Sequence, residues 1–432
     1  MKIKEPKNSN YCGTIVKIST IVPLENCDNV VAAQIMGNQV IVSKDVKIGD
    51  VGIYFSLETQ LTENYLFNNN LYSKLELNKD ITKKEYFDKN GRIRCVKFRG
   101  NKSEGLFMPM DSLSFVLNAK DQLEIGTEFD ELNGVVICQK YIVKPTIIPN
   151  VGGAKKRKVG KKAETKLIEN QFRFHTDTGM LYKNLHRIQT DDIVSITYKC
   201  HGTSAISSKV LCKKKLTWYE KVLKKLKVNI VDTHYDYIYS SRKVVKNSNL
   251  LDNTNSYYNE DIWGSTHNEL KEYLQDGMTI YYEVVGFLKN GSGIQKGYDY
   301  GCNPGQHKIM IYRITYTSSA GKVFEFSVKQ VKDWCKDHGL ETVPHLYYGH
   351  AKDFYNEDSS DIDVWRDGFL QTIKDNYNEK DCYICENRVP EEGCVVRIER
   401  NDFEAYKVKS NRFYEWETKM MDKGESNIED EN

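Results

Sequence analysis

The sequence of 432 residues lacks the features of a membrane or secreted protein. No apolar run approaches the ~20 residues that a membrane-spanning helix requires, and the N-terminal MKIKEPKNSNYC has no apolar core of a signal peptide. We therefore expect an intracellular protein without a membrane partner, and no feature indicates an obligate protein partner. Only 8 prolines occur beside many Asn, Lys, Tyr and Ile residues. Such a composition is typical of an AT-rich genome, for example that of a virus or phage.

The sequence also has little net charge and lacks the usual phosphate-binding loops. Its 62 basic and 60 acidic residues leave a formal charge of +2, so affinity for nucleic acid would depend on local basic patches. No GxxxxGK[ST] motif occurs, and the glycines at 291, 293 and 297 do not have GxGxxG spacing. Nucleotide binding must therefore use other residues.

Cysteine is present, but its spacing does not predict a metal site. The 11 cysteines are scattered, and Cys382 and Cys385 form a lone CxxC without an evident second ligand pair. In a reducing compartment such residues are mostly buried thiols. We expect no metal here, and the spacing assigns the CxxC no function.

The pattern of strands and helices predicts two modules of the α+β class. From Tyr11 to Phe55, runs such as TIVKIS, NVVAAQIM and QVIVSK alternate with turn residues. This predicts a small β-barrel of the OB type over residues 1–150, and other small barrels would show the same pattern. The polar stretch 56–92 is interpreted as an insertion in this module. Later, strand patterns alternate with helical ones such as WYEKVLKKLKV and SVKQVKDWCKDHG, which predicts a mixed α+β domain over residues 167–415.

Two further segments have the composition of flexible chain. Residues 151–166 combine paired glycines with a basic run and are interpreted as an exposed linker. Residues 416–432 end in DKGESNIEDEN, and we expect them to form an acidic, disordered tail.

Two clusters of basic residues could contact nucleic acid, although solvated surface charge is the simpler alternative for both. One cluster lies in the linker and the other surrounds Trp218 and Tyr219. Their members are Lys155, Lys156, Arg157, Lys158, Lys161 and Lys162, and Lys213, Lys214, Lys215, Lys221, Lys224, Lys225 and Lys227.

Lys199 stands at the end of a predicted strand. In IVSITYKCHGTS the alternation places it on the face opposite to Val194, Ile196 and Tyr198. A lysine beside a turn at Gly202 can lie close to the α-phosphate of a nucleotide, where lowered basicity would make its amine a nucleophile. Alone, the KxxG pattern is weak evidence, because most such lysines are simply exposed.

Five further motifs follow Lys199 in order. They are SSRK at 240–243, YYEVVG at 281–286, KIMIYRITY at 308–316, EEGCVVR at 391–397 and YKVKS at 406–410. This order resembles the covalent nucleotidyltransferase superfamily of ATP-dependent ligases and cap guanylyltransferases, whose motifs I, Ia, III, IIIa, IV and V occur in that sequence. The resemblance implies an adenylyltransferase domain that uses ATP and Mg²⁺ or Mn²⁺.

The resemblance also implies roles for eight residues. Lys199 is expected to be the catalytic nucleophile and Glu392 the ligand of the divalent metal. The expected nucleotide-binding residues are Gly202 in motif I, Arg242 and Glu283 for the ribose, Tyr312 for the adenine, and Lys407 and Lys409 for the phosphates. Because Lys407 and Lys409 are two residues apart on a predicted strand, they share one face. For Tyr312, a place in the core is the alternative to stacking on adenine.

Motif I has histidine where many ligases have aspartate, as Lys199-Cys200-His201-Gly202. The KxHGTS form is similar to one branch of ATP-dependent RNA ligases, as are the FxFHxDT pattern at 172–178 and KNLHR at 183–187. Members of that branch carry an N-terminal OB module. The implied reaction joins a 3'-hydroxyl to a 5'-phosphate through a lysyl-AMP enzyme and a 5'-adenylylated RNA. The expected substrate is a nicked RNA or RNA/DNA duplex with RNA on the 3'-hydroxyl side.

Two other functions compete with this one. A GTP-using mRNA capping guanylyltransferase would share most motifs, but it places an OB domain after motif V, where barely twenty residues remain after Lys409. A non-catalytic OB-fold RNA-binding protein would have lost the reactive residues. The presence of Lys199, Glu283, Glu392, Lys407 and Lys409 argues against such decay.

Overall fold

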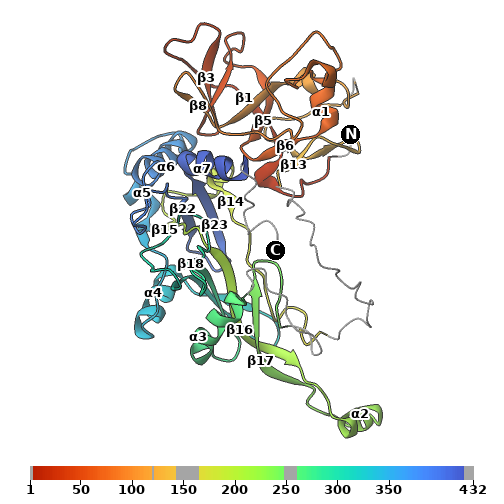
Figure 1. Cartoon of the computed structure of the whole chain (residues 1–432), viewed down its shortest axis with the longest axis vertical. Helices are drawn as coiled ribbons and strands as arrows, with labels where there is room; N and C mark the ends of the chain where they lie inside the picture. The colour runs from red at the N-terminus through yellow and green to blue at the C-terminus, as the bar shows by residue number, and fades with distance from the viewer. Residues whose placement is uncertain (1–2, 119–120, 143–164, 248–259, 423–432) are drawn as a thin grey trace.

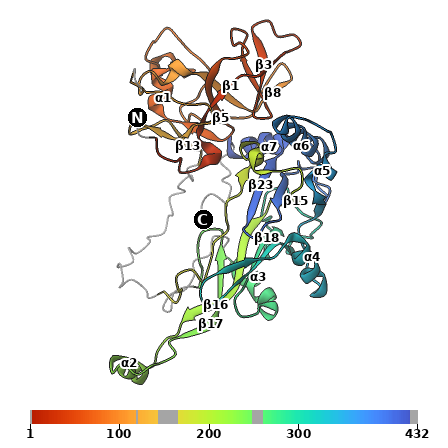
Figure 2. The ribbon, with the colours of Figure 1, turned by 180° about the vertical axis from the view of Figure 1, so that it is seen from behind.

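The computed structural model describes residues 3–118, 121–142, 165–247 and 260–422. An N-terminal barrel module stands on an elongated mixed domain, and a long two-stranded ribbon projects from the far end of that domain (Figures 1 and 2). Within the described residues, no helix is long and apolar enough to cross a membrane. The expected basic cluster at 155–162 lies outside these residues.

The N-terminal module is built from short antiparallel strands, as predicted. A four-stranded sheet has the order β10-β1-β5-β9, and a three-stranded sheet has the order β2-β3-β4. Along β4 buried and partly buried residues alternate, the period of a strand with one face on a core. The strands are β1 Gly13–Lys17, β2 Thr20–Pro23, β3 Val30–Ile35, β4 Asn38–Ser43, β5 Val51–Ser56, β6 Thr59–Leu61, β7 Val96–Phe98, β8 Asn101–Ser103, β9 Gly105–Pro109, β10 Glu128–Phe129, β11 Glu131–Leu132, β12 Val135–Val136 and β13 Cys138–Lys140.

The stretch 56–92, interpreted as an insertion from its polar composition, contributes to the core of this module. It contains β6 and the helix α1 (Glu63–Asn68), whose first turn is capped by the Thr62 hydroxyl, which accepts from the Tyr65 N–H. Tyr65 and Leu66 are fully buried, and Phe87 is nearly so. A few apolar side chains in a polar stretch are therefore enough to fix it to the barrel.

The second domain contains two five-stranded sheets. Their orders are β14-β23-β22-β15-β21 and β17-β16-β18-β19-β20. All pairings are antiparallel except that of β14 with β23. The strands are β14 Gly179–Met180, β15 Ile193–Tyr198, β16 Thr203–Lys213, β17 Thr233–Ser241, β18 Met278–Gly286, β19 His307–Thr317, β20 Val323–Glu325, β21 His345–His350, β22 Gly393–Ile398 and β23 Glu404–Lys409.

Among the described residues of this domain, the predicted helical patterns WYEKVLKKLKV and SVKQVKDWCKDHG form α2 and α4. The helices are α2 Trp218–Lys225, α3 Ile262–Leu270, α4 Val328–Asp337, α5 Ala351–Phe354, α6 Ile362–Tyr377 and α7 Asn411–Asp422. Helix α4 begins with a capping box between Ser327 and Gln330 and buries Val331 and Cys335 one turn apart. This spacing is that of an amphipathic helix on a sheet.

The domain begins slightly before the predicted boundary. Lys166, placed by composition in the linker, is buried, and its ammonium lies 3.1 Å from Asp236 of β17. Residues 151–164 of the predicted linker lie outside the described part of the chain.

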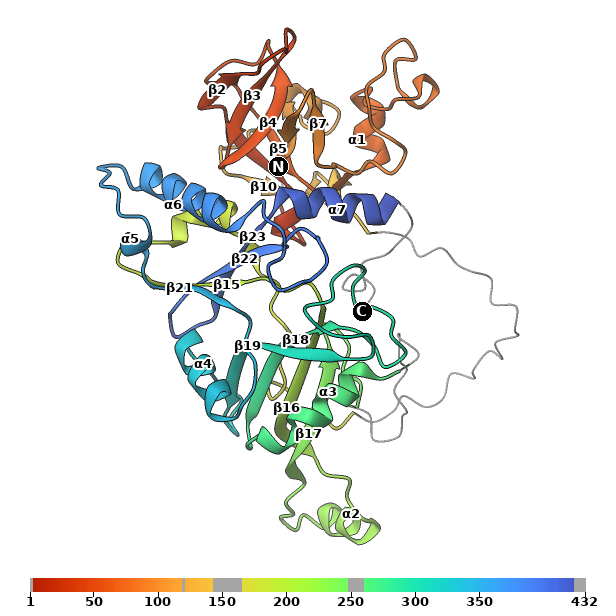
Figure 3. The same ribbon diagram turned by 60° about the vertical axis from the view of Figure 1, so that its left-hand side comes forward.

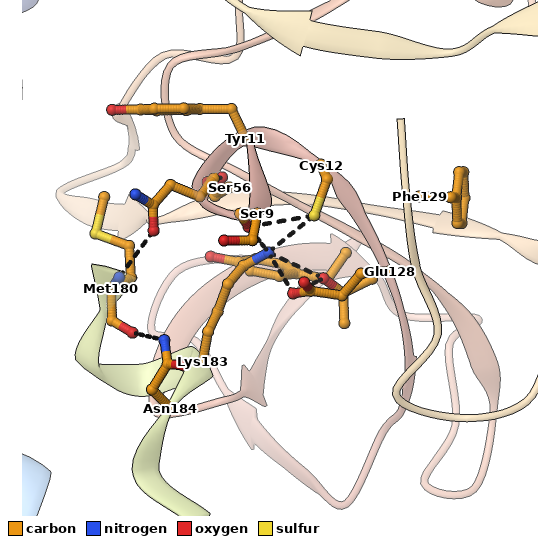
Figure 4. A network of polar contacts seen from close by, with 12 residues as sticks. Ser9, Tyr11, Cys12, Ser56, Glu128, Phe129, Met180, Lys183 and Asn184 are labelled. Atoms are coloured by element: carbon orange, nitrogen blue, oxygen red, sulfur yellow. Dashed lines mark hydrogen bonds and ion pairs between the residues drawn. The ribbon is translucent and has the colours of Figure 1, made fainter. Parts of the chain in front are cut away.

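A buried lysine of the KNLHR segment holds the two modules together. The Lys183 side chain is only 4% exposed, and its ammonium lies 2.9 Å from the Glu128 carboxylate of the barrel module (Figure 4). It also donates to the carbonyl of Ser9 at 2.6 Å and to the hydroxyl of Thr14 at 3.2 Å. Because the ammonium has three N–H groups, these partners satisfy a charge that would otherwise be costly to bury.

Helix α7 forms a second bridge between the modules (Figure 3). Phe413 and Tyr414 of α7 are buried, and the Arg92 guanidinium of the barrel module donates to the Thr418 hydroxyl at 3.2 Å. The prediction that an acidic tail starts at residue 416 is therefore wrong for residues 416–422, because they continue a helix that packs on the protein and buries Glu417 and Thr418. The remaining residues, 423–432, lie outside the described part of the chain.

Candidate nucleotide-binding and catalytic site

The candidate site is a pocket where the two sheets of the second domain meet the barrel module. Seven of the eight residues predicted from the sequence line it, although they are separated by up to 210 positions along the chain. Lys199 follows β15, Arg242 follows β17, and Glu392 precedes β22. The others lie within strands: Glu283 in β18, Tyr312 in β19, and Lys407 and Lys409 in β23.

Lys199 and Glu392 form an ion pair in this pocket. The backbone N–H of Lys199 donates to the carbonyl of Gly393 at 2.9 Å, and this bond aligns the ends of β15 and β22. As a result, the Lys199 ammonium lies 2.7 Å from the Glu392 carboxylate. Burial alone would raise the pKa of Glu392, but the charge of Lys199 and the contact with His201 outweigh burial and lower it to about 2.

His201, which stands where many ligases have aspartate, is a buried packing residue. Its ring makes edge contacts with Tyr298, Phe413 and Trp416 at centroid distances of 4.9–5.8 Å. Its Nδ1 lies 3.6 Å from the second oxygen of Glu392. This distance exceeds that of a hydrogen bond, so His201 orients the carboxylate mainly by filling the space behind it.

Lys407 and Lys409 share one face of β23, as predicted, but their environments differ. Lys409 lies 3.1 Å from the buried Glu417 of α7. Burial would lower the pKa of Lys409, yet Glu417 and Glu392 raise it above the ordinary value. Burial and the charges of Lys409 and Lys199 lower the pKa of Lys407 to about 7. Of these two lysines, Lys409 thus stays charged and Lys407 titrates near neutrality.

A pH dependence follows from Lys407. Above pH 7 this lysine loses its proton, so its attraction for a triphosphate weakens, and the KM for ATP should rise roughly tenfold between pH 7.5 and 9. Steady-state adenylylation across this range measures the effect. The variant Lys407→Arg keeps its charge and should show a flatter profile. Equal slopes for the two proteins would contradict the assignment.

The remaining predicted residues form the other wall. The Arg242 guanidinium lies 2.6 Å from the Asp177 carboxylate, and the Ser204 hydroxyl donates to Glu283 at 3.0 Å. The Tyr312 hydroxyl lies 3.0 Å from Nδ1 of His175. Asp177 and His175 belong to the FxFHxDT pattern, so that motif positions side chains of motifs Ia and IIIa.

Gly202 was predicted to bind the nucleotide, but it lies behind the pocket and does not line it. A Cβ atom on Gly202 would lie 2.3 Å from the carbonyl oxygen of Val284 and 2.9 Å from Cγ of Glu283. Only glycine therefore allows the turn after Lys199 to approach β18 so closely. Its role is to bring Lys199 and Glu283 into one pocket.

Sequence reasoning missed the contribution of the barrel module to the pocket. Its wall includes Tyr11, Glu58, Lys140 and Tyr141, which no motif identified. It also missed Glu417, the partner of Lys409. The signal for Glu417 was its position on the same face as Phe413 of a helical pattern, but the acidic composition of the C-terminal segment concealed it.

The donor set fits a divalent cation bound mainly through water and substrate. Among the described residues there is no group of three or more His, Cys, Asp or Glu side chains placed to hold a metal. Glu392 is a single buried carboxylate, and its second oxygen makes no hydrogen bond. Mg²⁺ typically keeps several waters and uses one or two carboxylates with substrate phosphates, so Glu392 fits this mode.

The CxxC pair lies close to this site, and among the described residues it belongs to no group of His, Cys, Asp or Glu side chains that could hold a metal. Cys382 is buried, Cys385 is partly buried, and all 11 cysteines of the chain are free. A hydrogen bond from Cys385 lowers the pKa of Cys382 to about 6.

Comparison with known proteins adds independent support for the fold. Residues 12–110 match the model of an OB-fold domain, and residues 192–412 match that of the RNA ligase family. No curated protein sequence matches the chain.

Solved structures of the RNA ligase from Naegleria gruberi share the fold over nearly the whole chain. A variant with ATP and Mn has a TM-score of 0.58 at 15% identity, covering 95% of this chain and 99% of the other. An apo variant gives 0.59 at 16% identity, and the enzyme with PPi gives 0.57 at 15% identity, with the same coverage. The RNA ligase family model matches half of the chain, and that half contains all the ordered motifs. The chain therefore belongs to the RNA ligase family.

Proposed function

We propose that this RNA ligase uses ATP, stores AMP on Lys199, and seals nicks in duplexes that have RNA on the 3'-hydroxyl side. The observation that carries the proposal is the convergence of Lys199, Glu392 and the two lysines of β23 in one pocket. Structures of the Naegleria enzyme with ATP or AMP and Mn support the choice of nucleotide and of a divalent metal.

In the first step the neutral amine of Lys199 attacks the α-phosphorus of ATP. An N–P bond forms, the bond from this phosphorus to the bridging oxygen breaks, and pyrophosphate leaves with the electron pair. One amine proton passes to water. Lys407 and Lys409 compensate the charge of the phosphates, while Glu283 and Arg242 are placed to orient the ribose.

A divalent cation held by Glu392 supplies charge neutralisation at the phosphate oxygens. The carboxylate that pairs with the Lys199 ammonium at 2.7 Å is therefore the one suited to the metal. A cation bound there would compete with the Lys199 ammonium for the Glu392 carboxylate.

In the next two steps, AMP passes to the 5'-phosphate of the RNA, and the 3'-hydroxyl then attacks that phosphate. The second attack forms the phosphodiester bond and releases AMP. The reaction needs in-line placement and compensated charge more than acid–base groups. A site that gathers several cations around the Glu392 carboxylate therefore matches it.

A defined nick tests the substrate proposal. Three oligonucleotides form a duplex with one nick, and the strand with the 3'-hydroxyl ends in RNA or in DNA. We expect sealing with ATP but not GTP, and at least tenfold faster sealing of the RNA end, because a contact to the ribose 2'-hydroxyl distinguishes the two. Equal rates for RNA and DNA ends would overturn the sugar preference, and efficient use of GTP would overturn the choice of nucleotide.

A further inference from the structure

Strands β16 and β17 continue well beyond the sheet that contains the pocket. β16 pairs with β18 only up to Ser208, whereas its pairing with β17 continues to Lys213. The outer part pairs β16 with β17, is also bridged by Leu167 at Cys212, and carries α2 at its tip (Figures 1 and 2). The 11 residues of β16 span roughly 35 Å.

Helix α2 projects from the rest of the protein and is capped by local contacts. None of its residues is buried. The Thr217 N–H donates to the Glu220 carboxylate at 2.8 Å within a capping box, and Lys214 lies 2.7 Å from the same carboxylate. These local contacts fix the start of the helix, so its large exposed side chains are not required for folding.

The tip combines exposed aromatic rings with unpaired cations. Trp218 is 79% exposed and Tyr219 is 51% exposed. Of the seven lysines around them, Lys214 pairs with Glu220 and Lys224 pairs with Asp232. The other five make no ion pair with any described residue; they are Lys213, Lys215, Lys221, Lys225 and Lys227.

We propose that this tip binds RNA of the substrate about ten nucleotides from the end being sealed. The lysines contact phosphates, while Trp218 and Tyr219 stack on unpaired bases, the combination that single-strand binding proteins use. A reach of roughly 35 Å corresponds to about ten phosphates at ~3.4 Å per nucleotide. The inference rests on the proposed function, because it assigns a second contact to the same substrate.

The connection to the pocket favours RNA over other partners. β16 starts four residues after Lys199, and β17 ends one residue before Arg242. Strands that hold the nucleotide site therefore also hold the tip at a fixed distance from the reacting ends. A membrane or a second copy of the chain could also cover Val222, Leu226 and other exposed apolar residues of the tip. A membrane or a second copy would not require the tip to lie at a fixed distance from the reacting ends. Binding to either one is an alternative outcome of the test.

The test measures sealing of a nicked duplex with and without a 15-nucleotide single-stranded RNA extension, placed in turn at each end. Two double variants change the tip, Trp218→Ser with Tyr219→Ser, and Lys221→Ser with Lys225→Ser. A matched control removes two exposed lysines of α4, Lys332→Ser with Lys336→Ser. In the wild type and the control, an extension should lower the KM for nucleic acid about tenfold at one end, an effect of the size expected for one stacked base.

Both tip variants should lose this advantage while retaining the wild-type kcat, the KM on the short duplex, and formation of lysyl-AMP. An extension without effect on the wild type, or an equal advantage in the tip variants, would overturn the proposal. So would a tip-dependent dimer or tip-dependent binding to anionic vesicles with RNA binding unchanged. Failure of the proposed function itself would appear separately, as loss of lysyl-AMP or of short-duplex sealing in the wild type.

Discussion

Replacing Lys199 with alanine should abolish transfer of AMP to the protein. Incubated with α-labelled ATP and Mg²⁺, the wild type should carry label that survives denaturing electrophoresis, whereas Lys199→Ala should show none above background. The reason is chemical, since the N–P bond requires the amine that lies 2.7 Å from Glu392 in the pocket. Sealing of a nick with ATP should fall at least a thousandfold.

Two controls separate loss of the nucleophile from loss of the fold. Lys199→Arg keeps the ion pair with Glu392 but supplies a guanidinium that is not nucleophilic, so it should be stable and equally unlabelled. Supplied with a 5'-adenylylated strand, both variants should retain part of the final sealing step, which does not use the amine. Label on Lys199→Ala would place the nucleophile elsewhere. Absence of label on folded wild type would favour an RNA-binding protein without catalysis.

Replacing Arg92 with alanine should cost about 3–5 kcal/mol of stability, because the change leaves a buried carboxylate unpaired. Arg92 is 1% exposed and makes two hydrogen bonds of 2.8 Å to Glu58, whose side chain is 6% exposed. It also lies over the ring of Tyr141 at 4.9 Å and donates to Thr418 of α7. One side chain thus joins the barrel, the pocket wall and the bridging helix.

Thermal and urea unfolding of the full chain measure this loss, and the midpoint temperature should fall by roughly 3–6 °C for a chain of this length. The double variant Glu58→Leu with Arg92→Met replaces both charges with apolar groups and should recover most of the stability. A control change of the exposed pair, Arg94→Ala, should cost under ~1 kcal/mol. A small effect of Arg92→Ala, or no recovery in the double variant, would show that the pair does not hold the modules.

Much of the site could be predicted because its residues lie at the ends of strands with clear alternation. The pattern around Lys199, the apolar strand that contains Glu283 and the spacing of Lys407 and Lys409 each placed a side chain on a definite face. Motif order then indicated that these faces meet. The barrel module was evident for a similar reason, since short strands separated by turn residues leave few other architectures.

The residues that could not be predicted act across long distances in the sequence. Lys183 pairs with Glu128, and Arg92 contacts Thr418. The residues around each of these positions in the sequence do not predict either contact. The packing of the polar stretch 56–92 and of the acidic C-terminal segment could not be predicted for one reason. The average composition of each segment reflects mainly its solvent-exposed residues. Its packing depends on a few buried apolar residues, such as Tyr65 and Phe413.

The barrel module supplies Glu58 and Tyr141 to the pocket, and this limits how the protein can be dissected. A fragment that starts near residue 165 would contain every recognised motif, yet it would lack one wall of the nucleotide site. It would also expose the buried face of α7, including Tyr414. A minimal form of this enzyme should therefore keep the barrel and be shortened only in its loops. Both modules contribute residues to one pocket, so neither can be removed without opening it.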